Sequence, residues 1–122
     1  GIEKTLFAML AGMRIKGWRK NDCTVAGKPD VVFHQARVAV FVDGCFWHGC
    51  PHCQRIMPKT NAEYWQGKIT RNVERGALCD RELRESGWAI VRIWEHEIAD
   101  KSNRSVIRAR IRQAVLKEAA NG

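Results

Sequence analysis

The chain has 122 residues and carries 21 lysines and arginines against 13 acidic residues, for a formal net charge of +8. That length suits one domain, and the 45% hydrophobic content is enough for one modest core. No run approaches the roughly 18 consecutive apolar residues of a membrane-spanning helix, so we expect no membrane attachment and a cytoplasmic location. A surface this basic favours a polyanionic partner, and nucleic acid is the first candidate.

Hydrophobic periodicity predicts seven elements, in the order helix, strand, strand, strand, helix, strand, helix. The expected helices cover residues 2–13, 60–86 and 105–119, and the expected strands cover residues 18–21, 30–33, 37–42 and 88–94. The strands at 30–33 and 37–42 form a hairpin. Thr60 and Glu63 have the spacing of a capping box, and Gly87 is placed to end the long helix. Since no repeat or linker interrupts the pattern, we expect one α/β domain over residues 1–122.

A segment rich in cysteine and histidine follows the hairpin, and its spacing is typical of a zinc site. Residues 45–53 read Cys-Phe-Trp-His-Gly-Cys-Pro-His-Cys. Five cysteines are an odd number for a disulfide framework, which also favours a metal over disulfides. The expected ligands, in order of preference, are Cys45, Cys50, Cys53 and His96, with His52 as the alternative to Cys53. Reduced cysteines without a metal are the competing interpretation, and it is the one we prefer for Cys23 and Cys79.

Acidic residues and a histidine are predicted to gather at one end of the hairpin. Asp30 leads into the first strand and Asp43 ends the second, so two carboxylates lie at corresponding ends of adjacent strands. Such a pair could hold Mg²⁺, which prefers oxygen ligands and lowers the pKa of a bound water. His48 can accept a proton near neutral pH. Glu3, on the first helix, is a further candidate carboxylate.

Several motifs resemble, in order and spacing, those of the very-short-patch-repair (Vsr) family of DNA mismatch endonucleases. The resemblance runs from residue 2 to about residue 97 and is most specific in Cys-Phe-Trp-His at 45–48. The other matching segments are Gly-Lys-Pro-Asp at 27–30, Val-Asp-Gly at 42–44, Pro-Lys-Thr-Asn at 58–61, Tyr-Trp at 64–65, Lys-Ile at 68–69 with Asn72, Gly-Trp at 87–88 and Trp-Glu at 94–95. The resemblance implies a restriction-endonuclease-like core, a mixed β-sheet flanked by helices, with a structural zinc site beside the active site.

The resemblance also implies roles at the active site. Asp30 and the backbone carbonyl of Val42 would bind Mg²⁺, His48 would activate the attacking water, and Glu3 would support the hydrated metal. Related restriction enzymes usually carry a lysine in the last catalytic position. No such lysine is evident from this sequence, and His48 takes that role. Asp43 stands where some relatives carry histidine, which leaves open whether a second imidazole assists the leaving group.

Five residues are implied to contact DNA. Phe46, Trp47 and Trp65 match aromatic residues that wedge into the duplex near the mismatch, where a poorly stacked T:G wobble pair makes unstacking less costly. Core packing is the alternative for Trp65, which also fits the apolar face of its helix. Lys68 and Asn72, one turn apart, would contact backbone phosphates and so position the duplex.

Together these features predict a Mg²⁺-dependent endonuclease with structural Zn²⁺ that nicks one strand 5′ to the thymine of a T:G mismatch in very-short-patch repair. A related homing endonuclease that cuts perfectly paired DNA is the first alternative. A non-catalytic zinc module that binds DNA is the second. The expected partner is double-stranded DNA with a mismatch, bound by a monomer at the bacterial-type nucleoid. The basic N-terminal arm that family members usually carry is expected to be absent.

Overall fold

The computed structural model describes residues 2–13, 15–21, 24–45 and 60–121. The helices in these ranges are α1 (Ile2–Met13), α2 (Ala62–Glu85), α3 (Glu95–Ala99), the 3₁₀ helix η1 (Lys101–Asn103) and α4 (Arg104–Asn121). The strands are β1 (Trp18–Lys20), β2 (Val31–Phe33), β3 (Val38–Asp43) and β4 (Ala89–Trp94). All seven expected elements are therefore confirmed, whereas α3 and η1 were not predicted. In the described part of the chain, no helix is both long and apolar enough to cross a membrane.

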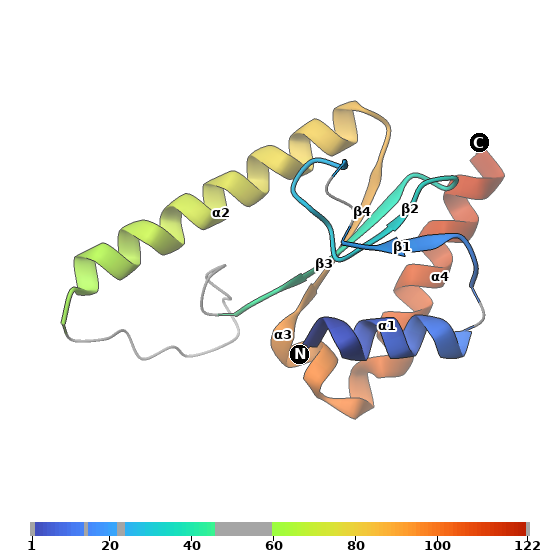
Figure 1. Cartoon of the computed structure of the whole chain (residues 1–122), viewed down its shortest axis with the longest axis horizontal. Coiled ribbons are helices and arrows are strands. Elements are labelled where there is room, and N and C mark those ends of the chain that lie inside the picture. Colours follow the sequence, from blue (N-terminus) through green and yellow to red (C-terminus); the bar gives the residue numbers. More distant parts are fainter. Residues whose placement is uncertain (1, 14, 22–23, 46–59, 122) are drawn as a thin grey trace.

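The four strands form one mixed sheet in the order β1-β2-β3-β4. The first three are antiparallel, and the register that places Val31 opposite Val40 confirms the predicted hairpin. Strands β3 and β4 are parallel, and their connection runs through α2, because parallel neighbours need a long crossover. Figure 1 shows α2 on one side of the sheet and α1 with α4 on the other. The predicted mixed sheet between helices is thus confirmed.

Alternating side chains of the strands supply two hydrophobic cores. The larger core joins the sheet to α1, α3 and α4, and its fully buried members include Leu6, Leu10, Val40, Ile93 and Ile111. The smaller core joins the sheet to α2 and consists of Val25, Val32, Ala39, Phe41 and Leu83. Because helices cover both faces of the central strands, functional groups carried by the sheet can reach solvent most readily at the strand ends.

Helix α2 starts in a way that the sequence did not indicate. The predicted capping box at Thr60 and Glu63 is wrong, because Asn61 is the N-cap residue and the helix begins at Ala62. Asn61 adopts a left-handed backbone (φ 60°, ψ 35°) and makes no side-chain capping hydrogen bond. Glu63 therefore falls at the second helical position, where it is one residue too early for the reciprocal bond of a capping box.

The end of α2 follows the prediction. Gly87 has a φ of 87°, a left-handed conformation that costs glycine little. Its N–H donates to the carbonyl of Arg84 at 3.0 Å, and the N–H of Trp88 donates to the carbonyl of Leu83 at 2.9 Å. These two bonds form a Schellman motif, which satisfies carbonyls that the helix itself leaves unpaired.

Gly27 marks a close approach between the loop before β2 and helix α2. Its φ is 81°, and a Cβ atom at this position would overlap the Sγ of Cys79 and press against the ring of Phe41. We expect Gly27→Ala to lower the free energy of unfolding by about 2–4 kcal/mol, because it combines overpacking with an unfavourable backbone conformation. Urea denaturation followed by circular dichroism measures this loss.

Gly12 provides the matched control, since a Cβ atom there would meet nothing within 4 Å. Gly12→Ala lies in helix α1 and should leave stability unchanged or raise it by about 0.5–1 kcal/mol. Equal effects of the two substitutions would contradict the close packing of Gly27 against α2.

Candidate functional site

Asp30 lies where the chain enters β2, beside the end of β3. Its Oδ2 accepts a hydrogen bond from the backbone N–H of Val42 at 2.7 Å. Burial raises the pKa of Asp30, and the nearby charges of Glu3 and Asp43 raise it further, against the opposing effect of the Val42 hydrogen bond. Asp30 therefore lies within electrostatic reach of Glu3 and Asp43, the other two carboxylates that the sequence singled out. A cation beside Asp30 would offset both the burial and the like charges, so Asp30 suits the role of a single carboxylate ligand to a metal ion such as Mg²⁺.

A cleft of about 540 Å³ opens beside Asp30, between helix α2 and the ends of β2 and β3. Its charged and polar lining consists of Lys28, Asp30, Asp43, Asn72, Arg75, Glu82 and Arg92. We call this the α2 cleft. Asp30 can ligate a metal ion, while the basic residues of the lining attract a polyanion. This combination suits chemistry on a phosphodiester.

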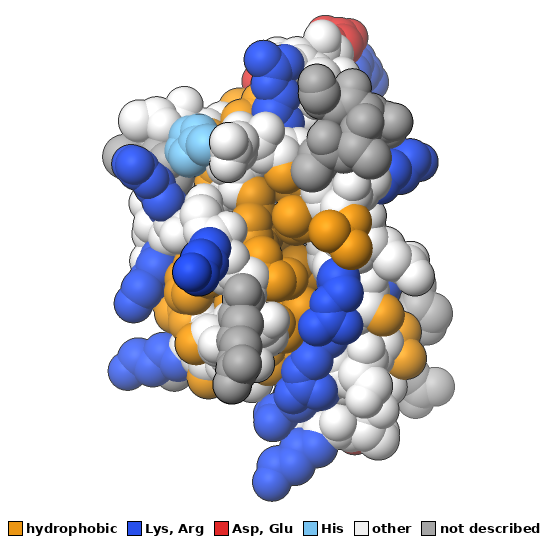
Figure 2. All heavy atoms as spheres, turned by 90° about the vertical axis from the view of Figure 1, so that its right-hand side faces the viewer, with side chains coloured by type: hydrophobic (Ala, Val, Ile, Leu, Met, Phe, Trp, Pro, Cys, Tyr) orange, Lys and Arg blue, Asp and Glu red, His pale blue; other side chains and the backbone are white. Residues whose placement is uncertain are grey.

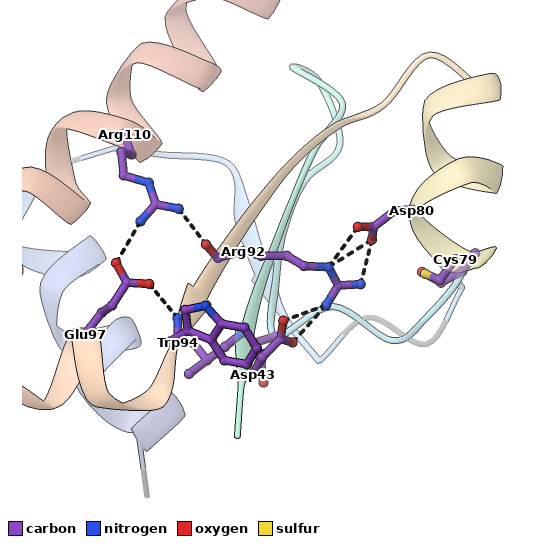
Figure 3. Close-up of polar contacts among 10 residues, drawn as sticks. Asp43, Cys79, Asp80, Arg92, Trp94, Glu97 and Arg110 are labelled. Atoms are coloured by element: carbon purple, nitrogen blue, oxygen red, sulfur yellow. Dashed lines mark hydrogen bonds and ion pairs between the residues drawn. The ribbon is translucent and has the colours of Figure 1, made fainter. Parts of the chain in front are cut away.

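Arg92, which lines the α2 cleft, forms ion pairs with two aspartates (Figure 3). Its Nη1 donates to the two carboxylate oxygens of Asp43 at 2.8 and 3.1 Å. Its Nε and Nη2 donate to Asp80, with a shortest distance of 2.6 Å. Burial opposes the charged guanidinium, but the hydrogen bonds and charges of Asp80 and Asp43 outweigh it and raise the pKa of Arg92. Asp43 is therefore part of an ion-pair network, which its place in the sequence did not reveal.

Two of the expected zinc ligands lie together at the same end of the sheet. Cys45 is buried just after β3, and its Sγ lies 3.2 Å from Nδ1 of His96, the second residue of α3. A thiolate and an imidazole at this separation suit a tetrahedral zinc site. Cys50, Cys53 and His52 lie outside the described residues. Within the described ranges, no group of three or more His, Cys, Asp or Glu side chains is arranged to hold a metal.

The expected DNA contacts divide between helix α2 and the segment before it. Trp65 is half-buried, and its ring lies 5.2 Å from that of Tyr64 and 5.9 Å from Nζ of Lys68. Among the described residues, Trp65 is a member of neither hydrophobic core. Asn72 lines the α2 cleft. Phe46, Trp47 and His48 lie outside the described residues, so their expected roles remain predictions.

The sequence interpretation missed several residues of the site. Lys28 and Arg75 line the cleft together with Asp30, although no catalytic lysine was recognised from the sequence. Lys28 also has a left-handed backbone, with φ 53°, which is uncommon for a residue other than glycine. Arg92 carried a usable signal, because it is the single charged residue in an otherwise apolar strand. A charge in such a place needs partners, and these are Asp43 and Asp80.

Positive charge by itself does not locate the site. Figure 2 shows the face at the right-hand side of Figure 1, where lysine and arginine side chains surround an apolar strip and acidic side chains are scarce. In Figure 1 this face lies away from the end of β3. Basic side chains therefore also gather on a face away from the α2 cleft, and the cleft is distinguished by its combination of acidic and basic groups.

Comparison with known proteins agrees with this geometry. Residues 1–55 match the family model described as DNA mismatch endonuclease Vsr. The chain is 36% identical over 114 residues to the type II nicking enzyme V.NmeAIP of Neisseria meningitidis, an alignment that covers 93% of this chain and 76% of that protein. It is 39% identical over 95 residues to the DNA mismatch endonuclease Vsr of Escherichia coli, covering 77% of this chain and 60% of that enzyme.

A third relative is more similar over a shorter stretch. The type II nicking enzyme V.NaeI of Lentzea aerocolonigenes is 53% identical over 70 residues, which are 57% of this chain and 42% of that protein. The chain thus spans less than half of V.NaeI and about three quarters of V.NmeAIP. The similarity to V.NmeAIP nevertheless runs through nearly the whole chain. The chain therefore belongs to the Vsr family of DNA mismatch endonucleases.

Proposed function

We propose that this protein is a Mg²⁺-dependent endonuclease that nicks one strand of duplex DNA 5′ to the thymine of a T:G mismatch. The observation that carries the proposal is the position of Asp30. This carboxylate is oriented by the Val42 N–H and lies in a cleft whose walls carry Lys28 and Arg75. Membership of the Vsr family, and relatives named as nicking enzymes, support cleavage of a single strand.

The proposed chemistry divides among residues of the cleft and two others, Glu3 and His48. Asp30 would hold Mg²⁺ with the backbone carbonyl of Val42, and Glu3 would support the waters around the ion. The ion would supply charge neutralisation at the phosphate and a more acidic water. His48 would accept the proton of the attacking water. Lys28 and Arg75 would draw the phosphodiester into the cleft. Attack of the water on phosphorus, with departure of the 3′ oxygen, would leave 5′-phosphate and 3′-hydroxyl ends.

A structural zinc ion is part of the same proposal. Cys45 and His96, whose side chains are in contact, would supply two ligands. Cys50 and either Cys53 or His52 would supply the others. Because Cys45 follows Asp43 by two residues, the ion would brace the chain that leaves the catalytic end of β3. It would also hold Phe46 and Trp47 in place to enter the DNA.

The requirement for a T:G mismatch is the most specific part of the proposed function. On short duplexes with Mg²⁺, we expect nicking of a T:G duplex to exceed that of the matched T:A duplex by at least about 100-fold. The reason is that unstacking a step costs a few kcal/mol in total and costs less at a wobble pair, and each 1.36 kcal/mol is a factor of ten in rate. Denaturing gels with each strand labelled in turn measure the rate and identify the strand that is cut.

The same panel separates the alternatives. Equal cleavage of the T:A and T:G duplexes would favour an enzyme that cuts paired DNA, as a homing endonuclease does. Salt-sensitive binding without cleavage at any Mg²⁺ concentration would favour a non-catalytic DNA-binding module. Either result would overturn mismatch-directed nicking.

A further inference from the structure

A single guanidinium group joins three elements of the fold at the floor of the α2 cleft. Arg92 projects from β4 and binds Asp43 at the end of β3 and Asp80 on helix α2 (Figure 3). Its guanidinium also lies 4.1 Å from the ring centre of Phe41. We call Asp80, Arg92 and Asp43 the clamp. All three side chains are largely shielded, with 18%, 24% and 10% of their surface exposed, so solvent screens these contacts only in part.

The clamp requires arginine for geometric reasons. The planar guanidinium contacts one carboxylate through Nη1 and the other through Nε and Nη2, while its face rests on an aromatic ring. A lysine ammonium has no planar fork and cannot reproduce this arrangement. The charge and the planar shape of the Arg92 side chain can therefore be tested separately, because lysine keeps the charge without the shape.

In the part of the chain that the structure describes, helix α2 makes few other buried contacts with the sheet. The helix is 24 residues long, yet among these described residues only Ile69 and Leu83 of α2 are buried. Its N-terminal half carries Trp65 and Lys68, which the sequence resemblance assigns to DNA contacts. From Asp80 to Trp65 the helix rises about 22 Å, so a tilt of about 3° would move Trp65 by about 1 Å. Displacements of that size at a reacting centre can cost about 100-fold in rate.

We propose that Arg92 is a positioning residue: by holding Asp80 against Asp43, it fixes the DNA-facing part of α2 relative to Asp30. The catalytic consequence rests on the proposed nuclease function. The clamp itself rests only on the contacts described above. In this role Asp43 anchors α2, while Asp30 is the carboxylate that meets the metal. Arg92 acts through α2 and does not touch the reacting phosphate.

The kinetic test compares single-turnover nicking of a T:G duplex, at saturating enzyme with Mg²⁺, and duplex binding with Ca²⁺ in its place. Arg92→Met should lower the nicking rate about 100-fold while changing Kd by less than about threefold. The reason is that the DNA-facing part of α2 is no longer aligned with Asp30, whereas the contacts to the DNA phosphates remain. Arg92→Lys should recover less than about a tenth of the parental rate. Asp80→Asn should lower the rate about 10-fold, as loss of a supporting partner commonly does.

Arg81→Met is the matched control. Arg81 is exposed and follows Asp80 directly on helix α2, so this substitution removes a positive charge close to the clamp without removing a member of it. It should stay within about twofold of the parental rate. Full recovery by Arg92→Lys, or a loss that appears only in Kd, would overturn the positioning role. If Arg92→Met does not fold, Asp80→Asn against Arg81→Met decides, and equal rates for those two would overturn it as well.

A second measurement needs no substrate. Amide hydrogen exchange without DNA should be about 10-fold faster between residues 66 and 79 of α2 in Asp80→Asn than in Arg81→Met, because loss of the tether allows local opening. Equal exchange in the two variants would refute the clamp. If the parent protein cuts no duplex, the proposed function is wrong. The exchange experiment would still decide whether Arg92 tethers α2.

Discussion

Replacing Asp30 with asparagine is expected to abolish strand cleavage and to leave DNA binding in place. The substitution keeps the shape of the side chain and an oxygen that can accept from the Val42 N–H, but removes the charge that would hold Mg²⁺. We expect single-turnover nicking to fall about 1,000-fold or more, corresponding to roughly 4 kcal/mol of transition-state stabilisation. Parallel binding titrations with Ca²⁺ should give a Kd within about threefold of the parent, since phosphate contacts position the duplex independently of Asp30.

The same substitution should not lower thermal stability. Folding raises the pKa of Asp30, chiefly through burial and also through Glu3 and Asp43, so the ionised carboxylate opposes folding above that pKa. An uncharged asparagine removes this opposition at neutral pH. In Mg²⁺-free buffer, the Tm of Asp30→Asn should therefore equal or exceed that of the parent.

Glu85, an exposed residue in the last turn of α2, provides the control. Glu85→Gln removes the same charge at a residue that does not line the cleft, and it should nick at the parental rate. His48→Ala should behave like Asp30→Asn if His48 accepts the proton of the attacking water. Nicking by Asp30→Asn within about 10-fold of the parent would refute Asp30 as the carboxylate that carries the reaction.

Replacing Cys45 with serine is expected to remove bound zinc and to destabilise the catalytic end of the sheet. Its Sγ lies 3.2 Å from Nδ1 of His96, and a hard hydroxyl is a poor substitute for a thiolate at such a site. Because metal-binding free energy contributes directly to folding, we expect the free energy of unfolding to fall by at least about 4 kcal/mol. Nicking should be lost with it. Elemental analysis of the purified protein and urea denaturation measure the two effects.

Cys79 offers a matched control for the zinc experiment. It is a thiol packed against the smaller core, where its Sγ lies 3.4 Å from the carbonyl of Ala26. Cys79→Ser should retain the zinc content of the parent. A folded parent that contains no zinc would refute the ligand assignment, and zinc retained in Cys45→Ser would remove Cys45 from it.

The positions of the helices and strands were predictable because buried apolar residues recur along the sequence with the period of a helix or a strand. Helix α1 begins and ends where its apolar residues predicted, and the β2–β3 hairpin has the expected pairing. The capping box failed because one residue, Asn61, takes a left-handed backbone that shifts the start of α2. The short α3 and η1 escaped prediction because each is too short for a helical period to register.

The sequence by itself determined which chemical groups are available. It singled out Asp30 with Asp43 and Glu3, and Cys45 with His96, because strand order and ligand spacing are local properties. In the folded chain the Sγ of Cys45 lies beside Nδ1 of His96, and Asp30 lies close enough to Glu3 and Asp43 for their charges to raise its pKa. Family membership could likewise be expected, since a motif such as residues 45–48 is read without knowing the fold.

Only the tertiary structure decided how those groups are arranged and which others join them. Arg92 and Asp80 are 12 residues apart, and Arg92 and Asp43 are 49 apart, so no local pattern links them. Their meeting depends on the parallel pairing of β3 with β4 and on the packing of α2 over the sheet. Asp43, which the sequence offered as a free carboxylate at a strand end, is consequently held by a guanidinium. Burial makes that pairing necessary, because a charge shielded from water needs a partner, and the fold alone determines which partner is within reach.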